Sequence, residues 1–469
     1  MAGIVSLPRN ETGIETVTGI LKQSFGERLQ TGQSIREQHG HTTTWIENQA
    51  PDAVVFPHST VEVSDIVKVC ATHDVPVIPY GTGTSLEGHV NAPAGGICID
   101  LSQMNAVLEV NADDLDCRVQ PGVTREDLNT WLRDKGLFFP IDPGANASLG
   151  GMASTRASGT NAVRYGTMKD NVLAVEAVMA DGRVIRTGTR ARKSSAGYDL
   201  TRLLVGSEGT LGIITEITLR LQGIPEAISS ARCSFPTVDA ACRAVTAVIQ
   251  YGVPVARIEL LDTTMVQAVN GYSALGLPET PLLLLEFHGT KTGVEEQAAI
   301  FGAIAADQGG SGFEATSTPE ERNRLWKARH DAYWAMLQYR PGAKGVATDA
   351  CVPISKLADC VNAAQERAAE LGLVAPIVGH AGDGNFHVTP LVFMDDPEEV
   401  AKAQDFVSWL SDLAISVGGT CTGEHGIGQG KQKYLEAELG DATLVMSAIK
   451  AALDPANIMN PGKIFAPQE

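Results

Sequence analysis

A short apolar stretch that runs straight into a loop of glycines and hydroxyl residues is the feature that most constrains the fold. Residues 76–80 are typical of a strand, and residues 81–88 follow it as Gly-Thr-Gly-Thr-Ser-Leu-Glu-Gly. Glycines let backbone N–H groups approach a ligand closely, which suits a pyrophosphate. The spacing matches neither Gly-x-Gly-x-x-Gly nor the P-loop pattern. A simple turn at the end of a strand is therefore the alternative interpretation.

Two further glycine-rich segments follow in the same half of the chain. Residues 142–166 consist largely of small side chains that do little to fill a core, and a structureless loop of this length is usually functional. Residues 203–214 form an apolar run broken by glycines. Between them, residues 173–180 and 183–188 predict two strands joined by an Asp-Gly turn.

Length and charge exclude several classes of protein. A chain of 469 residues is long enough for about three domain-sized units or two large ones. Its net charge of −19 argues against a nucleic-acid partner, because no basic surface is available to neutralise phosphates. Residues 1–10 lack the pattern of a signal peptide, and the longest apolar stretch, residues 282–285, is too short to span a bilayer. We expect a cytoplasmic protein without a transmembrane segment.

The eight cysteines are scattered and contain no Cys-x-x-Cys pair. This spacing excludes a ferredoxin-type cluster, a zinc ribbon and a c-type haem attachment site. We expect free and mostly buried thiols in a reducing compartment.

The pattern changes after residue 222, where strand and helix signals alternate. Residues 231–235, 257–260 and 281–287 predict strands, whereas residues 238–251 and 320–338 predict helices. This half of the chain therefore indicates an α+β sheet layered by helices.

Two histidines flank a glycine-rich turn in this second half. A tight turn at Asp383 would fold a hairpin with His380 roughly opposite His387, both rings facing one side. A second glycine-rich loop carries Glu424 and His425. Two histidines and one carboxylate with an open position are typical of a catalytic divalent metal site, although a lone strand histidine is more often structural. Asp383 itself is more typical of a turn residue than of a ligand.

The three glycine-rich segments, in this order, resemble the FAD-binding domain of the vanillyl-alcohol oxidase and p-cresol methylhydroxylase superfamily, from about residue 51 to 221. The resemblance implies that the first segment holds the diphosphate, the second lies along the ADP and the isoalloxazine, and the third contacts the adenine side. It implies these cofactor-binding residues: Pro79, Gly81, Thr82, Gly83, Thr84, Ser85, Pro143, Gly144, Ser148, Gly151, Ser158, Gly159, Gly206, Glu208, Gly212, Ile213 and Asn460. Some relatives attach the flavin covalently through a histidine in the first loop, where this chain has Thr84, so we expect non-covalent FAD.

The second half resembles the FAD-linked D-2-hydroxyacid dehydrogenases of the cytochrome-type D-lactate dehydrogenase group. The resemblance is carried by the hairpin histidines, the Glu-His pair, Trp-Lys-Ala-Arg-His at residues 326–330 and Asn-Pro-Gly-Lys-Ile-Phe at residues 460–465. It implies that a divalent metal, expected to be Zn²⁺ with Mn²⁺ or Fe²⁺ as alternatives, is bound by His380, His387 and Glu424. It implies that His425 is the catalytic base, and that Arg329 and Lys344 bind the substrate carboxylate.

The family implies an α+β protein with four segments. These are a helical lead-in (1–50), a two-part FAD-binding domain of the p-cresol methylhydroxylase type (51–222), a substrate and metal domain with a ferredoxin-like sheet and helices (223–455), and a C-terminal segment that returns to the flavin (456–469).

The expected activity is oxidation of a D-2-hydroxyacid by hydride transfer to flavin N5, with D-lactate as substrate and pyruvate as product. Tyr333, one helical turn beyond Arg329, favours a small monocarboxylate, because a second carboxylate would need a polar or cationic partner there. Alternatives are a glycolate dehydrogenase flavin subunit, a D-2-hydroxyglutarate dehydrogenase, a metal-free oxidase of alcohols or sugars, and an FAD-carrying subunit that needs a partner. Electrons would leave to an external cytochrome, quinone or electron-transfer protein, and a peripheral place at the membrane through this acceptor is the alternative to a purely cytoplasmic one. A homodimer is a further expectation.

Overall fold

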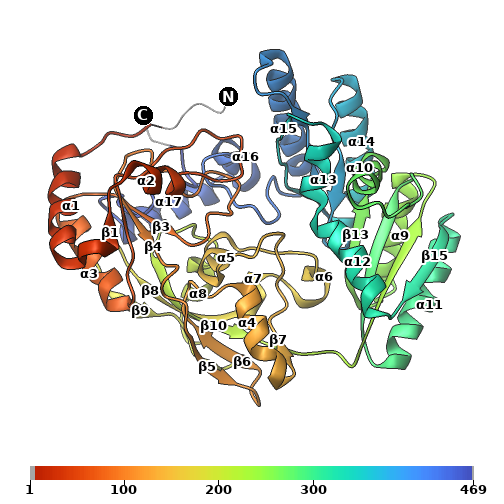
Figure 1. Cartoon of the computed structure of the whole chain (residues 1–469), viewed down its shortest axis with the longest axis horizontal. Helices are drawn as coiled ribbons and strands as arrows, with labels where there is room; N and C mark the ends of the chain where they lie inside the picture. The colour runs from red at the N-terminus through yellow and green to blue at the C-terminus, as the bar shows by residue number, and fades with distance from the viewer. Residues whose placement is uncertain (1–5, 467–469) are drawn as a thin grey trace. The chain divides into compact units, whose positions relative to one another are not determined.

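The computed structural model describes residues 6–466. The first five residues of the expected lead-in and the last three of the expected C-terminal segment lie outside this range. The chain forms two compact units, drawn in Figure 1. The central unit contains Gly159–Tyr165 and Pro225–Gly423, and the N-terminal unit contains the described residues up to Ser158, then Gly166–Ile224 and the chain from Glu424 onward.

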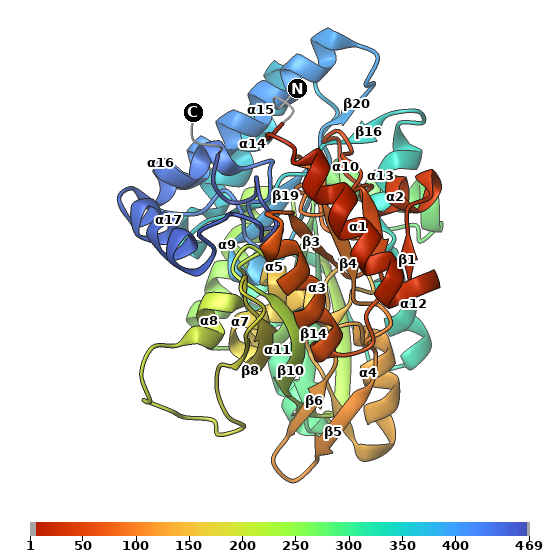
Figure 2. The same cartoon turned by 90° about the vertical axis from the view of Figure 1, so that its left-hand side faces the viewer.

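The first sheet of the N-terminal unit has the order β1-β2-β4-β3, and β2, β4 and β3 run parallel. Its strands are β1 (Leu29–Gln30), β2 (Ala53–Val55), β3 (Val77–Tyr80) and β4 (Ile97–Asp100). Helix α3 (Thr60–Thr72) connects β2 to β3, and the side chain of Ser59 caps it by accepting the Glu62 N–H. Figure 2 shows α1 (Glu11–Phe25) beside α3, with which it is in contact. The strand expected before the first glycine loop is therefore present as β3.

The second sheet of this unit is antiparallel, in the order β5-β6-β10-β8-β9. Its strands are β5 (Val107–Asn111), β6 (Asp116–Val119), β8 (Val172–Val178), β9 (Val184–Arg186) and β10 (Ile213–Arg220), with β7 (Leu137–Phe138) pairing β11 (Gln222–Gly223) apart from it. The other helices of the unit are α2 (Gln33–His39), α4 (Arg125–Leu132), α5 (Leu149–Thr155), α7 (Met168–Asn171), α8 (Leu200–Leu204), α16 (Leu435–Leu439) and α17 (Ala442–Leu453).

Residues 142–166 are not the structureless loop that the sequence predicts. They contain α5 and, in the central unit, α6 (Ala162–Tyr165). Leu149, Met152 and Ala153 on α5 are buried in the core of the second sheet, so apolar packing stabilises a helix despite its glycines.

The central unit is built on a sheet of order β15-β12-β14-β13-β18-β19-β17. Its strands are β12 (Ala227–Ser234), β13 (Val255–Leu261), β14 (Leu282–Gly289), β15 (Ser311–Thr316), β17 (Ala350–Cys351), β18 (Ile377–Gly379) and β19 (Asn385–Val388), and β16 (Lys344–Gly345) pairs β20 (Leu391–Val392) separately. Its longer helices are α9 (Val238–Gln250), α10 (Thr263–Ser273), α11 (Lys291–Asp307), α12 (Pro319–His330), α13 (Ala332–Tyr339), α14 (Leu357–Glu370) and α15 (Pro397–Ser416).

Alternation along β13 and β14 gives this sheet one apolar and one partly charged face. Ile258 and Leu285 alternate with Glu259 and Glu286, and all four side chains are buried. Figure 1 shows α9 and α11 on one side of the sheet and α10, α12 and α13 on the other. The charged positions share their face with Leu284, which lies in one core with residues of α12 and α13. Buried charges thus lie beneath the α12–α13 layer.

The single helix predicted over residues 320–338 is in fact two helices, α12 and α13, which meet at Asp331. Trp326 of α12 and Met336 of α13 lie in the same core, so the break allows both helices to bury apolar side chains.

All eight cysteines are free, and all but the partly exposed Cys351 are buried, which confirms the expectation for the thiols. Between residues 6 and 466 there is no helix whose length and apolar character suffice for a membrane crossing.

Candidate metal and flavin sites

The predicted hairpin forms from β18 and β19, but its register differs from the expectation. His387 pairs with Val378, and His380 lies just beyond the end of β18. The turn is longer than a two-residue loop, because a 3₁₀ turn at Ala381–Asp383 precedes Gly384, whose φ of 77° is left-handed. The two rings nevertheless approach, with centroids 5.5 Å apart and planes at 85°.

Both hairpin histidines use Nδ1 as a hydrogen-bond donor. His387 Nδ1 lies 2.9 Å from the carbonyl oxygen of Thr348, and His380 Nδ1 lies 2.8 Å from a carboxylate oxygen of Glu259. Carbonyl and ionised carboxylate oxygens only accept, so Nδ1 carries the proton in each ring. Nε2 of each ring then presents its lone pair, which is the form in which histidine binds a metal.

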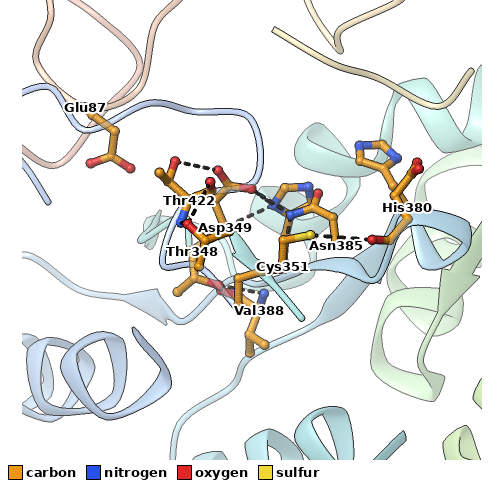
Figure 3. A network of polar contacts seen from close by, with 12 residues as sticks. Glu87, Thr348, Asp349, Cys351, His380, Asn385, Val388 and Thr422 are labelled. Carbon is orange, nitrogen blue, oxygen red and sulfur yellow. Dashed lines mark hydrogen bonds and ion pairs between the residues drawn. The ribbon is translucent and has the colours of Figure 1, made fainter. Parts of the chain in front are cut away.

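Asp349 is a buried carboxylate beside His387 that the sequence analysis did not identify. It is 1% exposed, and its Oδ1 accepts the side-chain N–H of Asn385 at 2.9 Å. Its Oδ2 accepts the hydroxyl of Thr422 at 3.0 Å, and His387 Nδ1 lies 3.7 Å from Oδ1. Figure 3 shows Asp349 at the centre of these contacts.

Glu424 and His425 follow Gly423 directly in the chain, and the Gly423 N–H donates to the backbone oxygen of Asp349 at 3.0 Å. Asp349, His387, Glu424 and His425 each offer one ligand atom, and these atoms all lie within 4.8 Å of one another. Two imidazoles and two carboxylates form a donor set suited to a divalent cation such as Zn²⁺.

This group overlaps with the predicted ligand set without being identical to it. It contains His387 and Glu424, and it adds Asp349 and His425, the residue predicted as the base. His380 lies outside the group, although its ring is close to that of His387.

Arg329, predicted to bind the substrate carboxylate, contacts the same buried carboxylate as His380. Its Nε and Nη2 lie 2.8 Å and 2.6 Å from Glu259 Oε2, and Nη1 takes no part in this pair. Burial alone would raise the pKa of Glu259, but its contacts with His380 and with the guanidinium of Arg329 hold that pKa below its usual value. Lys344 lies on the separate β16–β20 ribbon and is exposed, and its pairing with Arg329 at a substrate carboxylate stays a prediction.

Glu259 is the second residue that sequence analysis missed. Its signal was present, because Arg257 and Glu259 place charges at alternate positions of a strand that is otherwise apolar. A charged side chain that is buried in a strand requires charged or hydrogen-bonding partners, so such a pattern predicts a polar contact inside the fold.

Parts of all three glycine-rich segments come together within the N-terminal unit, whereas residues 159–165 of the second segment belong to the central unit. A Cβ on Gly81 would lie 2.2 Å from Ser148 Oγ, and one on Gly209 would lie 2.4 Å from the Pro79 ring. Thr82 Oγ1 accepts the Ser148 N–H at 3.4 Å. The first loop therefore borders both of the other segments.

Two buried hydroxyls in this region support FAD binding. Ser85 Oγ and Ser148 Oγ have no hydrogen-bond partner among residues 6–466. Buried polar groups are almost always hydrogen-bonded, so two unpartnered hydroxyls beside glycine loops fit a missing polar ligand. The phosphates and ring oxygens of FAD provide such acceptors.

The remaining predicted cofactor residues lie at several places along the chain. Pro143, Gly144 and Gly151 belong to the N-terminal unit, Ser158 is the last residue before the chain enters the central unit, and Gly159 is the first residue inside it. Gly206 has a left-handed φ of 90°, and Gly212 precedes Ile213 at the start of β10.

Glu208 lies in the third glycine segment, and it contacts the last stretch of the chain, which begins at Glu424 and includes Asn460. Glu208 accepts the N–H groups of Ile427 and Gly428 at 2.7 and 2.8 Å, and His89 lies 3.2 Å from its Oε2. Asn460 donates to the Glu208 carbonyl at 2.7 Å. Glu208 is thus held by protein groups in this structure, and its contact with FAD stays a prediction.

Two family models match the chain: "FAD binding domain" over residues 51–188 and "FAD linked oxidases, C-terminal domain" over residues 224–464. A probable mitochondrial D-lactate dehydrogenase of Danio rerio is 49% identical, over 96% of this chain and 92% of the relative. The mitochondrial D-lactate dehydrogenase [cytochrome] of Arabidopsis thaliana is 46% identical, over 95% and 79%. Glycolate oxidase subunit GlcD of Bacillus subtilis is 36% identical, over 95% and 96%.

Among solved structures, p-cresol methylhydroxylase superposes with a TM-score of 0.80 over 98% of this chain and 99% of its own, at 18% identity. A 4-ethylphenol oxidase from Gulosibacter chungangensis gives 0.79 over 99% of both chains, also at 18%. These likenesses confirm the expected fold class. The chain belongs to the FAD-linked oxidases, in the group that includes the cytochrome-type D-lactate dehydrogenases.

Proposed function

We propose that this protein oxidises D-lactate to pyruvate with FAD and a divalent metal, and passes the electrons to an external acceptor. The observation that carries the proposal is the pair of hairpin histidines, each of which donates its Nδ1–H to an acceptor, so that the lone pair lies on Nε2. The relatives named for D-lactate oxidation support this substrate.

The residues in the second half of the chain fit a metal site. His380, His387 and Glu424 are the proposed ligands. His387 and Glu424 belong to the close group, the centroid of the His380 ring lies 5.5 Å from that of His387, and Asp349 adds a further carboxylate. When bound, a divalent cation would make the α-hydroxyl of a 2-hydroxyacid more acidic by stabilising the alkoxide. The same donor set suits Zn²⁺, Mn²⁺ or Fe²⁺, and Zn²⁺ is the first choice for two imidazoles with carboxylate.

His425 is the proposed base for the hydroxyl proton. It follows Glu424 in the chain, and its ligand atom belongs to the same close group. An imidazole accepts a proton near neutral pH, which suits removal of a metal-acidified hydroxyl proton. FAD, when bound, would supply the acceptor for the hydride from the substrate carbon.

Arg329 and Lys344 are proposed to bind the substrate carboxylate. The Nη1 group of Arg329 is the part of the guanidinium not used in its pair with Glu259. Fixing the carboxylate orients the reacting carbon, which is a positioning contribution to the rate.

Tyr333 supports a preference for a small acid. A Cβ on Gly345 would lie 3.6 Å from Tyr333 Cε2, so the ring lies close to the residue after Lys344. The phenol of Tyr333 carries no positive charge, so it cannot balance a second carboxylate. This disfavours D-2-hydroxyglutarate. Glycolate is the second candidate substrate, because it has a single carboxylate and one relative is named as a glycolate oxidase subunit.

The test is anaerobic flavin reduction in the purified chain, with D-lactate, L-lactate, glycolate and D-2-hydroxyglutarate as substrates. We expect D-lactate to bleach the flavin fastest, and a chelator to abolish bleaching until Zn²⁺ or Mn²⁺ is returned. Full bleaching by metal-free protein would refute the metal role. No bleaching without a second protein would instead favour a subunit that depends on a partner.

Several further expectations stay predictions. These are the external acceptor (a cytochrome, quinone or electron-transfer protein), a homodimer, cytoplasmic placement, and the division at residues 50, 222 and 455.

A further inference from the structure

The carboxylate of Glu259 binds two predicted site residues, one with each oxygen. Oε1 lies 2.8 Å from His380 Nδ1, and Oε2 lies 2.8 Å and 2.6 Å from Nε and Nη2 of Arg329. Glu259 is 0% exposed and lies on β13, whereas its partners come from α12 and from the end of β18. One buried group therefore connects three elements of the central unit.

Fold stability alone does not account for this arrangement. Moving a carboxylate out of water costs free energy, and well-packed apolar side chains often stabilise a fold as well as a buried ion pair does. The charge of Glu259 also determines how His380 and Arg329 are oriented. Both partners are residues expected to act on metal or substrate.

We propose that Glu259 is a positioning residue, which fixes the tautomer of His380 and the orientation of Arg329 so that one carboxylate aligns the metal ligand with the substrate clamp. This inference rests on the proposed function and deepens it.

The chemistry of the two contacts explains the role. An ionised carboxylate accepts but does not donate, so His380 carries its proton on Nδ1 and keeps the Nε2 lone pair for a cation. Arg329 donates two N–H groups to one oxygen, which leaves the Nη1 group for a substrate carboxylate. Loss of the carboxylate would release both partners at once.

Glu286 provides a matched control on the neighbouring strand β14. It is 4% exposed, and its Oε1 lies 2.8 Å from His288 Nε2 and 3.7 Å from Arg257 Nε. It is thus a buried glutamate with a histidine and an arginine partner, but neither partner is a predicted site residue. E286Q removes a comparable buried charge without touching His380 or Arg329.

The experiment compares full-length wild type, E259Q and E286Q. Glutamine keeps the shape but offers one acceptor and one donor, so it cannot accept from both His380 and Arg329. We expect E259Q to bind Zn²⁺ about 10- to 100-fold more weakly in calorimetric titration of metal-free protein. With saturating Zn²⁺ we expect a raised KM for D-lactate and a smaller change in kcat. E286Q should stay within about twofold of wild type in its Zn²⁺ affinity and in its KM for D-lactate. E259Q with wild-type Zn²⁺ affinity and KM overturns the proposal.

Failure of the proposed function gives a different result. If wild type binds no Zn²⁺, or its flavin is not reduced by D-lactate, then the proposed function fails and this inference fails with it. If wild type behaves as proposed and E259Q matches it, only the role of Glu259 is overturned.

A measurement on the wild type covers the case in which E259Q does not fold. The ¹⁵N spectrum of histidine-labelled, metal-free protein reports the tautomer of each ring, and H380Q identifies the His380 signals by their loss. A His380 ring with its proton on Nδ1 supports the proposal, and a ring with its proton on Nε2 overturns it.

Discussion

His387 donates its Nδ1–H to the backbone carbonyl of Thr348 over 2.9 Å, which leaves Nε2 as the ligand atom. A backbone acceptor cannot be removed by mutation of a side chain, so this orientation depends on the path of the backbone just before β17. We expect His387→Gln to lower the Zn²⁺ affinity of metal-free protein by about 100-fold or more, because loss of a ligand exceeds the loss of a supporting contact.

The control for this variant is His58→Gln. His58 is exposed and bonds Gln103 in the N-terminal unit, so it tests whether removal of any histidine matters. Equal Zn²⁺ affinity in H387Q and wild type would exclude His387 as a ligand.

His425→Ala tests the proposed base. We expect the variant to retain FAD and metal, since the proposed ligands remain, while the rate of anaerobic flavin reduction by D-lactate falls by about 10²- to 10⁴-fold. Stopped-flow absorbance measures the rate, and metal analysis confirms the content. An unchanged rate would mean that another group removes the hydroxyl proton.

The sequence predicted the parts of the site that depend on short-range signals. The glycine loop after β3 and the hairpin around Gly384 are local patterns, and both are present. The partners of Glu259 could not be predicted in this way, because His380 is 121 residues and Arg329 70 residues away along the chain. Alternation predicts which strand positions share a face, but pairing across elements depends on the tertiary fold.

The second glycine-rich segment was misread for a physical reason. Glycines suggest a loop, yet Gly150 lies inside α5, where a Cβ would be 2.5 Å from Pro121 Cβ. Gly150 allows two backbone segments to approach closely. Sequence composition does not distinguish a glycine needed for close packing from one needed for a flexible turn.

Gly384→Ala tests how tightly the hairpin turn is built. Gly384 has a φ of 77°, and a Cβ there would lie 2.1 Å from the carbonyl oxygen of Val352. A left-handed L-residue costs about 1–2 kcal/mol, and the clash with backbone adds to it. We expect a lower Tm by calorimetry and weaker Zn²⁺ binding.

Gly372→Ala is the matched control in the same unit. Its φ is 69°, but a Cβ there meets no atom within 4 Å. We expect G372A to lose only the stability that a left-handed L-residue costs, and to keep the Zn²⁺ affinity of wild type. A G384A protein as stable as G372A would mean that the turn relaxes without disturbing the histidines.

Ser148→Ala tests the flavin cradle. Ser148 is 1% exposed, and its hydroxyl has no partner among the described residues, so we expect it to bond to FAD. Loss of one hydrogen bond of about 0.5–1.5 kcal/mol corresponds to about a 2- to 10-fold increase in the Kd for FAD. The Tm of the cofactor-free protein should not fall, because no bond is lost in that state.

Ser64→Ala gives the opposite pattern. Ser64 Oγ donates to the Gly182 carbonyl at 2.6 Å, away from the glycine loops. This variant should lower the Tm and leave the Kd for FAD unchanged. If S148A leaves FAD affinity at the wild-type value, then its hydroxyl does not contact the cofactor.

Asp262 makes the stability of the central unit dependent on pH. It caps α10 by accepting the Met265 N–H at 2.8 Å, and the same oxygen accepts the Ile377 N–H at 3.0 Å. Burial raises its pKa to about 6 despite these bonds. In the unfolded chain an aspartate titrates near pH 4, so between about pH 4 and 6 the folded state binds more protons. This contribution to stability is therefore complete below about pH 4 and is lost as the pH rises through 6.

Asp262→Asn isolates this contribution, because its amide oxygen still accepts both N–H groups but does not titrate. A pKa difference of this size corresponds to about 3 kcal/mol. We expect the Tm of D262N relative to wild type to rise between pH 4 and 7, since only wild type loses stability from this group. Other groups titrate in both proteins and cancel in the difference. Parallel Tm curves over this range would show that Asp262 has an ordinary pKa in the folded protein.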